Sequence, residues 1–135
     1  MSAADSLVEL IRDTSSSLPG DVAAALSSAV RRERAGSSAA VVLKTILDNV
    51  ALVKSRGVPL CQDTGTLTFF VDRRLRRTVT PDALKAAVAR ATKLGYLRRN
   101  TIDAVTGLSY DDNTAEGAPV VHYVDAADGP RRGRS

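Results

Sequence analysis

The sequence is poor in cysteine, histidine and tryptophan. Its 135 residues include one cysteine, one histidine and no tryptophan. A single cysteine excludes a disulfide within the chain. Such sparse cysteine usage favours a reducing compartment, so we expect a cytoplasmic protein.

Long hydrophobic runs are also missing. The chain contains no stretch of about 18 consecutive apolar residues, which excludes a transmembrane helix. The first residues, Met1 to Asp13, carry acids and lack the basic start and apolar centre of a secretory signal. We therefore expect no membrane partner and no signal peptide.

Aromatic residues are too few to support nucleic-acid binding, although the formal net charge is +4. The arginines gather at Arg73–Arg77 and again at Arg131–Arg134, and none of the two phenylalanines and three tyrosines is interleaved with them. Binding of nucleic-acid strands usually needs basic groups on one face together with stacking aromatics. A solvated charged loop is the better interpretation of Arg73–Arg77, and no nucleic-acid partner is expected.

Hydrophobic periodicity predicts an α/β chain with a helical N-terminal half. Helices are expected over residues 4–17, 21–34, 39–55 and 81–94, and strands over residues 67–72 and 119–124. Because the last helix separates the two strands, we expect the strands to pair in parallel. The prediction is a small sheet with an intervening helix, after a largely helical half.

Several local features refine this picture. The wide apolar stripe of residues 39–55 predicts burial on more than one side, and the apolar run Leu67–Val71 suits a strand buried on both faces. Gly57 fits a left-handed helix cap. Asn49 either lies on a solvated edge or points to the segment beyond Gly57 and binds its backbone. The polar loop 103–118 is long enough to suggest function or mobility.

The stretch Val58–Thr66 is the densest group of polar residues and includes the only cysteine. An amide, a carboxylate, hydroxyls and a glycine stand beside Cys61, between a predicted helix and a predicted strand. A lone cysteine is often just a small buried residue. The alternatives for its neighbours are a tight polar turn, with Asp63 capping and Gly65 at positive φ, or a site that also uses such a turn.

This stretch resembles the signature of the iron–sulfur hydro-lyases, namely class I fumarate hydratases and the α subunits of L(+)-tartrate dehydratases. The resemblance begins with Cys61-Gln62-Asp63-Thr64-Gly65 and extends in order over about residues 40–124. The flanking segments that look similar are Ile46-Leu47-Asp48-Asn49, Phe69-Phe70-Val71, Leu97-Arg98-Arg99-Asn100, the loop from Thr106 to Asn113, and Ala118-Pro119-Val120-Val121-His122.

The resemblance implies a function and roles for particular residues. These enzymes reversibly dehydrate a small 2-hydroxy dicarboxylic acid, malate or tartrate, at a [4Fe–4S] cluster. Cys61 would be one of three cysteine ligands of the cluster, and Asp63 the acid–base group at the leaving oxygen. Gln62 would bind a substrate carboxylate, and Arg98 would clamp one with two hydrogen bonds. Arg98 is preferred to Arg99 because Leu-Arg-x-Asn is the family-like pattern. His122 is expected to be structural.

The chain also departs from the family pattern. The two further cysteines are absent, and so is the glycine-rich segment expected after His122. The resemblance implies that a β subunit or a C-terminal domain supplies the remaining groups, in an oligomer. We therefore expect residues 1–124 to be the N-terminal part of a truncated α-type catalytic domain, followed by a disordered basic tail at 125–135. The alternative is a non-catalytic partner domain of the same fold that has lost the cluster.

Overall fold

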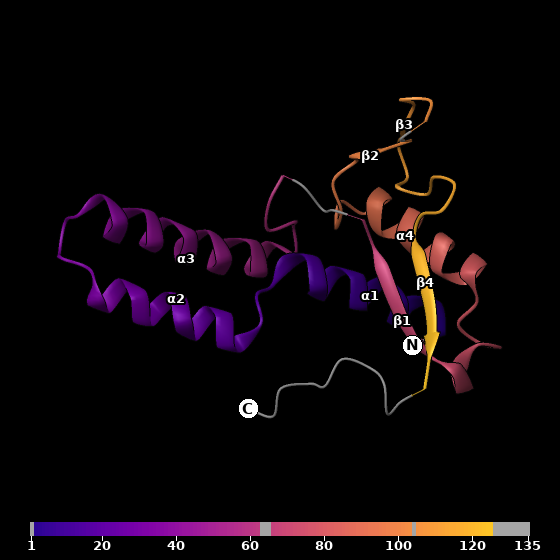
Figure 1. Ribbon diagram of the computed structural model, residues 1–135, viewed down its shortest axis with the longest axis horizontal. Coiled ribbons are helices and arrows are strands. Elements are labelled where there is room, and N and C mark those ends of the chain that lie inside the picture. Colours follow the sequence, from indigo (N-terminus) through magenta and orange to yellow (C-terminus); the bar gives the residue numbers. More distant parts are fainter. Residues whose placement is uncertain (1, 63–65, 104, 126–135) are drawn as a thin grey trace.

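The predicted α/β class and the parallel pairing are confirmed by the computed structural model, which describes residues 2–62, 66–103 and 105–125 (Figure 1). Two strands pair in parallel, and α4 connects them. The elements in chain order are α1 Ala3–Ser16, α2 Gly20–Arg32, α3 Ser38–Arg56, β1 Thr68–Asp72, the short 3-10 helix η1 Arg73–Leu75, α4 Pro81–Lys93, β2 Thr101–Ile102, β3 Ser109–Tyr110 and β4 Val120–Val124.

Side-chain caps explain where three of the helices begin. Ser2 and Asp5 form a reciprocal capping box at α1. The hydroxyl of Ser37 accepts from the Ala40 amide at α3, and the hydroxyl of Thr80 accepts from the Ala83 amide at α4. Helix α3 ends at Gly57, whose φ of 61° is the predicted left-handed cap.

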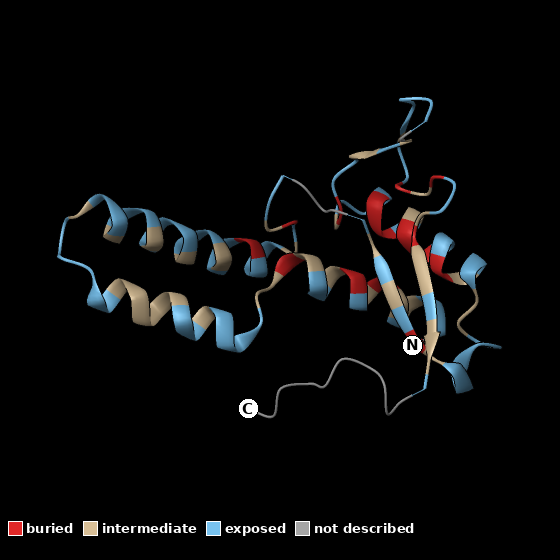
Figure 2. Cartoon of the chain, viewed as in Figure 1, coloured by how far each residue is buried: buried red, intermediate tan, exposed pale blue. Residues whose placement is uncertain are grey.

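The core lies where α1 packs on α4 and on one face of the sheet. Its buried side chains come from both helices and from Leu97, and Leu67, Phe69 and Tyr96 pack against them. The burial colours of Figure 2 show this concentration on α1 and α4. The buried members of the cluster are Val8, Ile11, Ala87, Val88, Ala91 and Leu97.

Helices α2 and α3 pack on each other and extend away from that core (Figure 1). Every residue of α2 is at least partly exposed. The prediction that α3 is buried on more than one side is wrong for this chain, since Val41 and Val42 are 57% and 56% exposed. Within the described residues, the side of α3 facing α2 and the end around Val53 are the parts that find partners, because a two-helix hairpin covers one face of each helix.

The sheet is likewise covered on one side only. In register, Phe69 lies beside Val121 and Phe70 beside His122. Since side chains alternate between faces, Phe69 packs towards the core whereas Phe70 is 57% exposed and stacks on His122 with ring centroids 5.2 Å apart. The prediction of a strand buried on both faces is therefore wrong here, because in the described residues only the helical side of the sheet has covering elements.

A small ladder that the sequence did not reveal joins the start of the polar loop to the residues just before it. Strands β2 and β3 pair antiparallel, Thr101 with Tyr110 and Ile102 with Ser109. Asp103 closes the turn between them by accepting from the amides of Val105 and Thr106. Two-residue strands are too short to show alternation, so propensity could not locate them. No helix among the described residues is long and apolar enough to cross a membrane.

Candidate functional site

The segment bearing Cys61 leaves α3 and is tied down immediately before the cysteine. Pro59 is buried, and the Leu60 amide donates to the carbonyl of Ser15 at 2.9 Å. The Asn49 amide group donates to the Leu60 carbonyl at 3.2 Å, so Asn49 binds the backbone beyond Gly57, as one of the two alternatives predicted. Both polar groups of the Leu60 backbone are thus held, one by α1 and one by α3.

The predicted site residues after this anchor reach the surface. Cys61 and Gln62 are exposed, so Cys61 is not a small buried core residue. Asp63 and Gly65 lie outside the described residues, and so does the predicted capped turn. A backbone held at Leu60 followed by exposed polar side chains is suited to presenting these side chains to a ligand.

The segment bearing Arg98 leaves α4 and is anchored in a similar way. Leu97 is 4% exposed in the core, whereas the Arg98 side chain is exposed. The Arg98 carbonyl accepts from the Asn113 amide group at 2.7 Å. The chain is therefore fixed on both sides of the Arg98 α-carbon.

Ser15, at the end of α1, joins these two segments. Its carbonyl accepts from Leu60, one residue before Cys61, and its hydroxyl donates to the carbonyl of Tyr96 at 2.8 Å, two residues before Arg98. One helix end thus brings together backbone segments far apart in sequence. A serine at a helix terminus is too common for the sequence to have identified it. The roles expected from the sequence require Cys61, Gln62, Asp63 and Arg98 to converge on one concave surface, and this convergence stays a prediction.

An apolar groove of about 500 Å³ lies between α2 and α3 and reaches Cys61. Asn49 and Leu60 are also part of its wall. The groove shows that the cysteine lies at the border between apolar surface and water. The complete lining is Leu18, Val22, Leu26, Thr45, Ile46, Asn49, Val50, Leu60 and Cys61.

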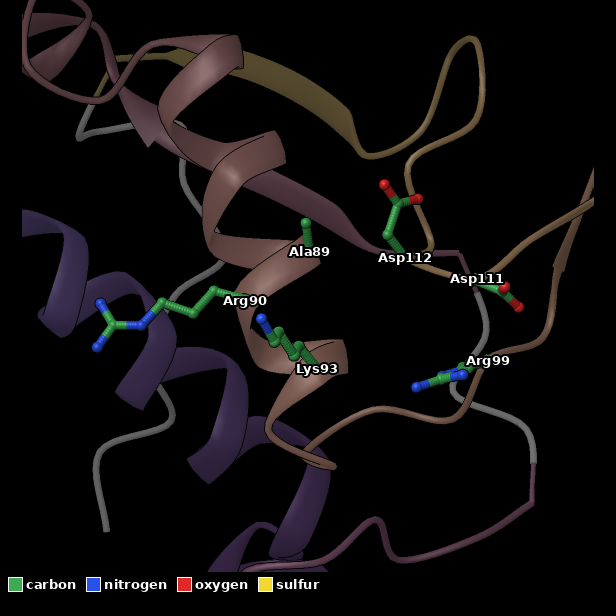
Figure 3. Close-up of a pocket in the computed structure, with 6 residues that line it drawn as sticks. All are labelled: Ala89, Arg90, Lys93, Arg99, Asp111 and Asp112. Carbon is green, nitrogen blue, oxygen red and sulfur yellow. The ribbon is translucent and has the colours of Figure 1, made fainter.

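A second depression, of about 550 Å³, lies between α4 and the polar loop and includes Arg99 (Figure 3). Arg90 turns from this depression towards α1, where its guanidinium contacts Asp5 at 2.8 Å. Lys93 and Arg99 line the depression together with the acidic pair Asp111 and Asp112. With cations and carboxylates mixed, this depression favours neither sign of ligand.

The carboxylates with clearly lowered pKa values lie outside the Cys61 and Arg98 segments. The guanidinium of Arg74 lowers the pKa of Asp72 to about 2, aided by the Arg74 amide. The amide and hydroxyl of Thr106 lower the pKa of Asp103. Asp72 lies where the charged Arg73–Arg77 loop begins, and Asp103 serves the β2–β3 turn. These shifts therefore reflect local structure rather than a reactive centre.

The donor set of this chain does not suffice for a [4Fe–4S] cluster. The sequence has a single thiol, whereas such clusters are held chiefly by several cysteine thiolates. Among the described residues, no three histidine, cysteine or acidic side chains gather closely enough to hold a metal ion. Cys61 fits one ligand of a shared cluster, because it is exposed and follows a fixed backbone.

Comparison with known proteins decides the family. The family model described as Fumarate hydratase (Fumerase) matches residues 4–131. The chain belongs to the fumarate hydratase family. The match includes α2 and nearly all of α1, whereas the resemblance seen in the sequence extended over about residues 40–124, and so the family extends over the helical half as well.

Individual relatives support the assignment to the fumarate hydratase family. A putative class I fumarate hydratase of Geobacillus stearothermophilus is 41% identical over 88% of this chain, which covers 24% of that protein. A putative L(+)-tartrate dehydratase subunit alpha of Methanocaldococcus jannaschii is 30% identical over 90% of the chain. The same subunit of Escherichia coli (strain UTI89 / UPEC) is 28% identical over 94%. The chain spans 44% of the length of each alpha subunit.

Proposed function

We propose that this chain is part of a hydro-lyase that reversibly dehydrates malate to fumarate or tartrate to oxaloacetate. The observation that carries the proposal is the double attachment at Ser15, which joins the Cys61 and Arg98 segments. These are the two segments to which the family resemblance assigns ligand contacts. The printed names of the relatives, fumarate hydratase and tartrate dehydratase, supply the substrate class.

The chain's own residues would bind and orient the substrate. Arg98 would hold one carboxylate by two parallel hydrogen bonds, which sets its position and its angle. Gln62 would donate to the other carboxylate. Asp63 would exchange a proton at the oxygen that leaves as water. A small dicarboxylate held at both ends loses most of its freedom before reaction, which lowers the barrier.

The cofactor would be shared with other polypeptide. A bound [4Fe–4S] cluster would supply a Lewis-acidic iron, and Cys61 would be one of its ligands. The remaining thiolates and the base would come from a β subunit or a further domain, as the alpha-subunit names of two relatives suggest. This chain alone should therefore show no turnover. A cytoplasmic location remains the sequence-based prediction.

A hybrid enzyme tests the proposal. Residues 4–125 of this chain would replace the matching segment of the Geobacillus stearothermophilus relative, and malate dehydration would be followed by fumarate absorbance, with tartrate as second substrate. We expect turnover that Cys61→Ser abolishes. Arg98→Ala should raise KM on the order of thirtyfold or more, which corresponds to about 2 kcal/mol for truncating one partner of a charged pair.

Arg99→Ala is the matched control, since it removes a neighbouring exposed arginine. KM should change little in this variant. A hybrid that binds its cluster and keeps full activity with Cys61→Ser would contradict the ligand role. Failure of the folded, cluster-containing hybrid to dehydrate either acid would favour the alternative, a non-catalytic partner domain.

A further inference from the structure

We infer that Asn113 is the positioning residue of the Arg98 substrate clamp. The inference rests on the proposed function, because it concerns how the arginine of that site is held. Asn113 lies in the loop after β3 and is 4% exposed. It is the one non-glycine residue in the described part of the chain with positive φ, at 61°.

The amide group of Asn113 makes hydrogen bonds in two directions. Its nitrogen donates to the Arg98 carbonyl at 2.7 Å and to the Thr92 hydroxyl at 3.0 Å. Its oxygen accepts from the amides of Asn100 and Thr101, each at 3.2 Å, and from the Thr101 hydroxyl at 2.9 Å. Both N–H groups are therefore used, and so is the oxygen.

These contacts connect the arginine segment to the buried part of α4. Thr92 is buried on α4, and its hydroxyl in turn donates to the Val88 carbonyl at 2.9 Å. Val88 is fully buried in the core. Asn113 thus transmits the position of α4 to the backbone on the C-terminal side of Arg98, while Leu97 anchors the other side.

Asparagine also suits the left-handed backbone at position 113. At positive φ a β-branched or bulky residue is strained, whereas asparagine is tolerated. Leucine of similar size would provide no hydrogen bond, and aspartate would provide no N–H. Asparagine therefore meets the conformational requirement and supplies the donors that the Arg98 and Thr92 oxygens need.

A clamp with two parallel hydrogen bonds depends strongly on this placement. Its geometry tolerates little displacement, because both hydrogen bonds must keep their length and angle at the same time. If the Arg98 carbonyl loses its partner, the peptide plane after Arg98 can rotate and carry the side chain with it. The effect should appear mainly in substrate binding.

The test uses Asn113→Asp, which keeps the size and the accepting oxygen but removes both donations. In the full chain, NMR should show faster backbone motion at Arg98, while the amides of Asn100 and Thr101 remain protected. In the hybrid enzyme, KM for malate should rise about tenfold while kcat stays within about threefold. Asn113→Gly tolerates the positive φ and deletes the side-chain amide, so it should raise KM by a similar factor. This second variant provides the test if Asn113→Asp fails to fold.

Asp112→Asn is the matched control, because it makes the reverse exchange one residue earlier. Its side-chain oxygen can still accept from Thr114, as in the native chain, and the Asn113 contacts remain. KM should stay within about twofold of the native value. Unchanged KM in both Asn113 variants, where Arg98→Ala raises it, would overturn the inference and leave the proposed function intact. If Arg98→Ala leaves KM unchanged, Arg98 does not clamp the substrate, and the role that the proposed function gives to it is wrong.

Discussion

At the scale of the single residue, the Asp5 carboxylate accepts hydrogen bonds from two different helical regions. It accepts from the Ser2 hydroxyl at 2.7 Å in the cap of α1 and from Arg90 of α4 at 2.8 Å. The hydrogen bond from Ser2 and then that from Arg90 lower the pKa of Asp5 to about 2. The same carboxylate therefore caps one helix and links it to another.

This shift predicts a pH dependence of stability. An aspartate has a pKa of about 3.9 in the unfolded chain, so the stabilisation by Asp5 is complete above that pH and is lost as the pH falls towards 2. Asp5→Asn should reduce the loss of stability over this window, as measured by urea unfolding at a series of pH values. Asp72, whose pKa is also lowered to about 2, should account for part of the slope that remains. Identical pH profiles for the native chain and the variant would contradict the assignment.

At the scale of the element, the C-terminus of α3 decides where the Cys61 segment begins. Gly57 adopts φ 61°, and its amide donates to the Val53 carbonyl to close the helix. A Cβ at this position would meet only the Arg12 side chain, at an ordinary 3.7 Å. A substitution here should therefore act through backbone conformation rather than through a steric clash.

Gly57→Ala should lower the free energy of unfolding by about 1 kcal/mol, because alanine is disfavoured in the left-handed region. Gly20→Ala is the matched control. Gly20 lies in the first turn of α2 with nothing within 4 Å of an added Cβ, so alanine should be neutral or stabilising there. Urea titration followed by circular dichroism measures both. Equal effects at the two glycines would show that the left-handed cap is not the cause.

At the scale of the whole molecule, two apolar surfaces lack cover in the described part of the chain. One is the face of the sheet that carries Phe70 and His122, and the other is the side of α3 that carries Val41 and Val42. Parallel sheets are ordinarily buried on both faces, and contiguous exposed apolar surface marks interaction sites. The chain should therefore associate, with itself or with a partner.

Phe70→Ser should reduce that association, because it removes the largest exposed apolar side chain of the sheet face. Sedimentation velocity at increasing protein concentration measures the change. Val105→Ser is the control, since Val105 is 94% exposed in the turn between β2 and β3 and belongs to neither surface. It should leave sedimentation unchanged. Association that persists undiminished in Phe70→Ser would place the interface elsewhere.

The sequence by itself determined the helices, the two long strands, their parallel pairing and the family. These follow from local rules: apolar periodicity defines helices, Ser37 and Thr80 cap them, and Gly57 ends one of them. The motif around Cys61 needs no folding to be recognised. The candidate site residues Cys61, Gln62 and Asp63 came from that motif, and Arg98 came from the family-like segment Leu97-Arg98-Arg99-Asn100. Their convergence stays a prediction.

Only the tertiary structure decided what holds the site segments and which faces are covered. Ser15 and Asn113 act through hydrogen bonds to backbone groups distant in sequence, and such contacts leave no periodic pattern. The exposure of Phe70 and Val41 could not be inferred either, because an apolar run shows that a side chain favours burial but not whether a partner is present to bury it. Burial depends on the arrangement of whole elements, whereas helix and strand formation depends mainly on neighbours in the chain.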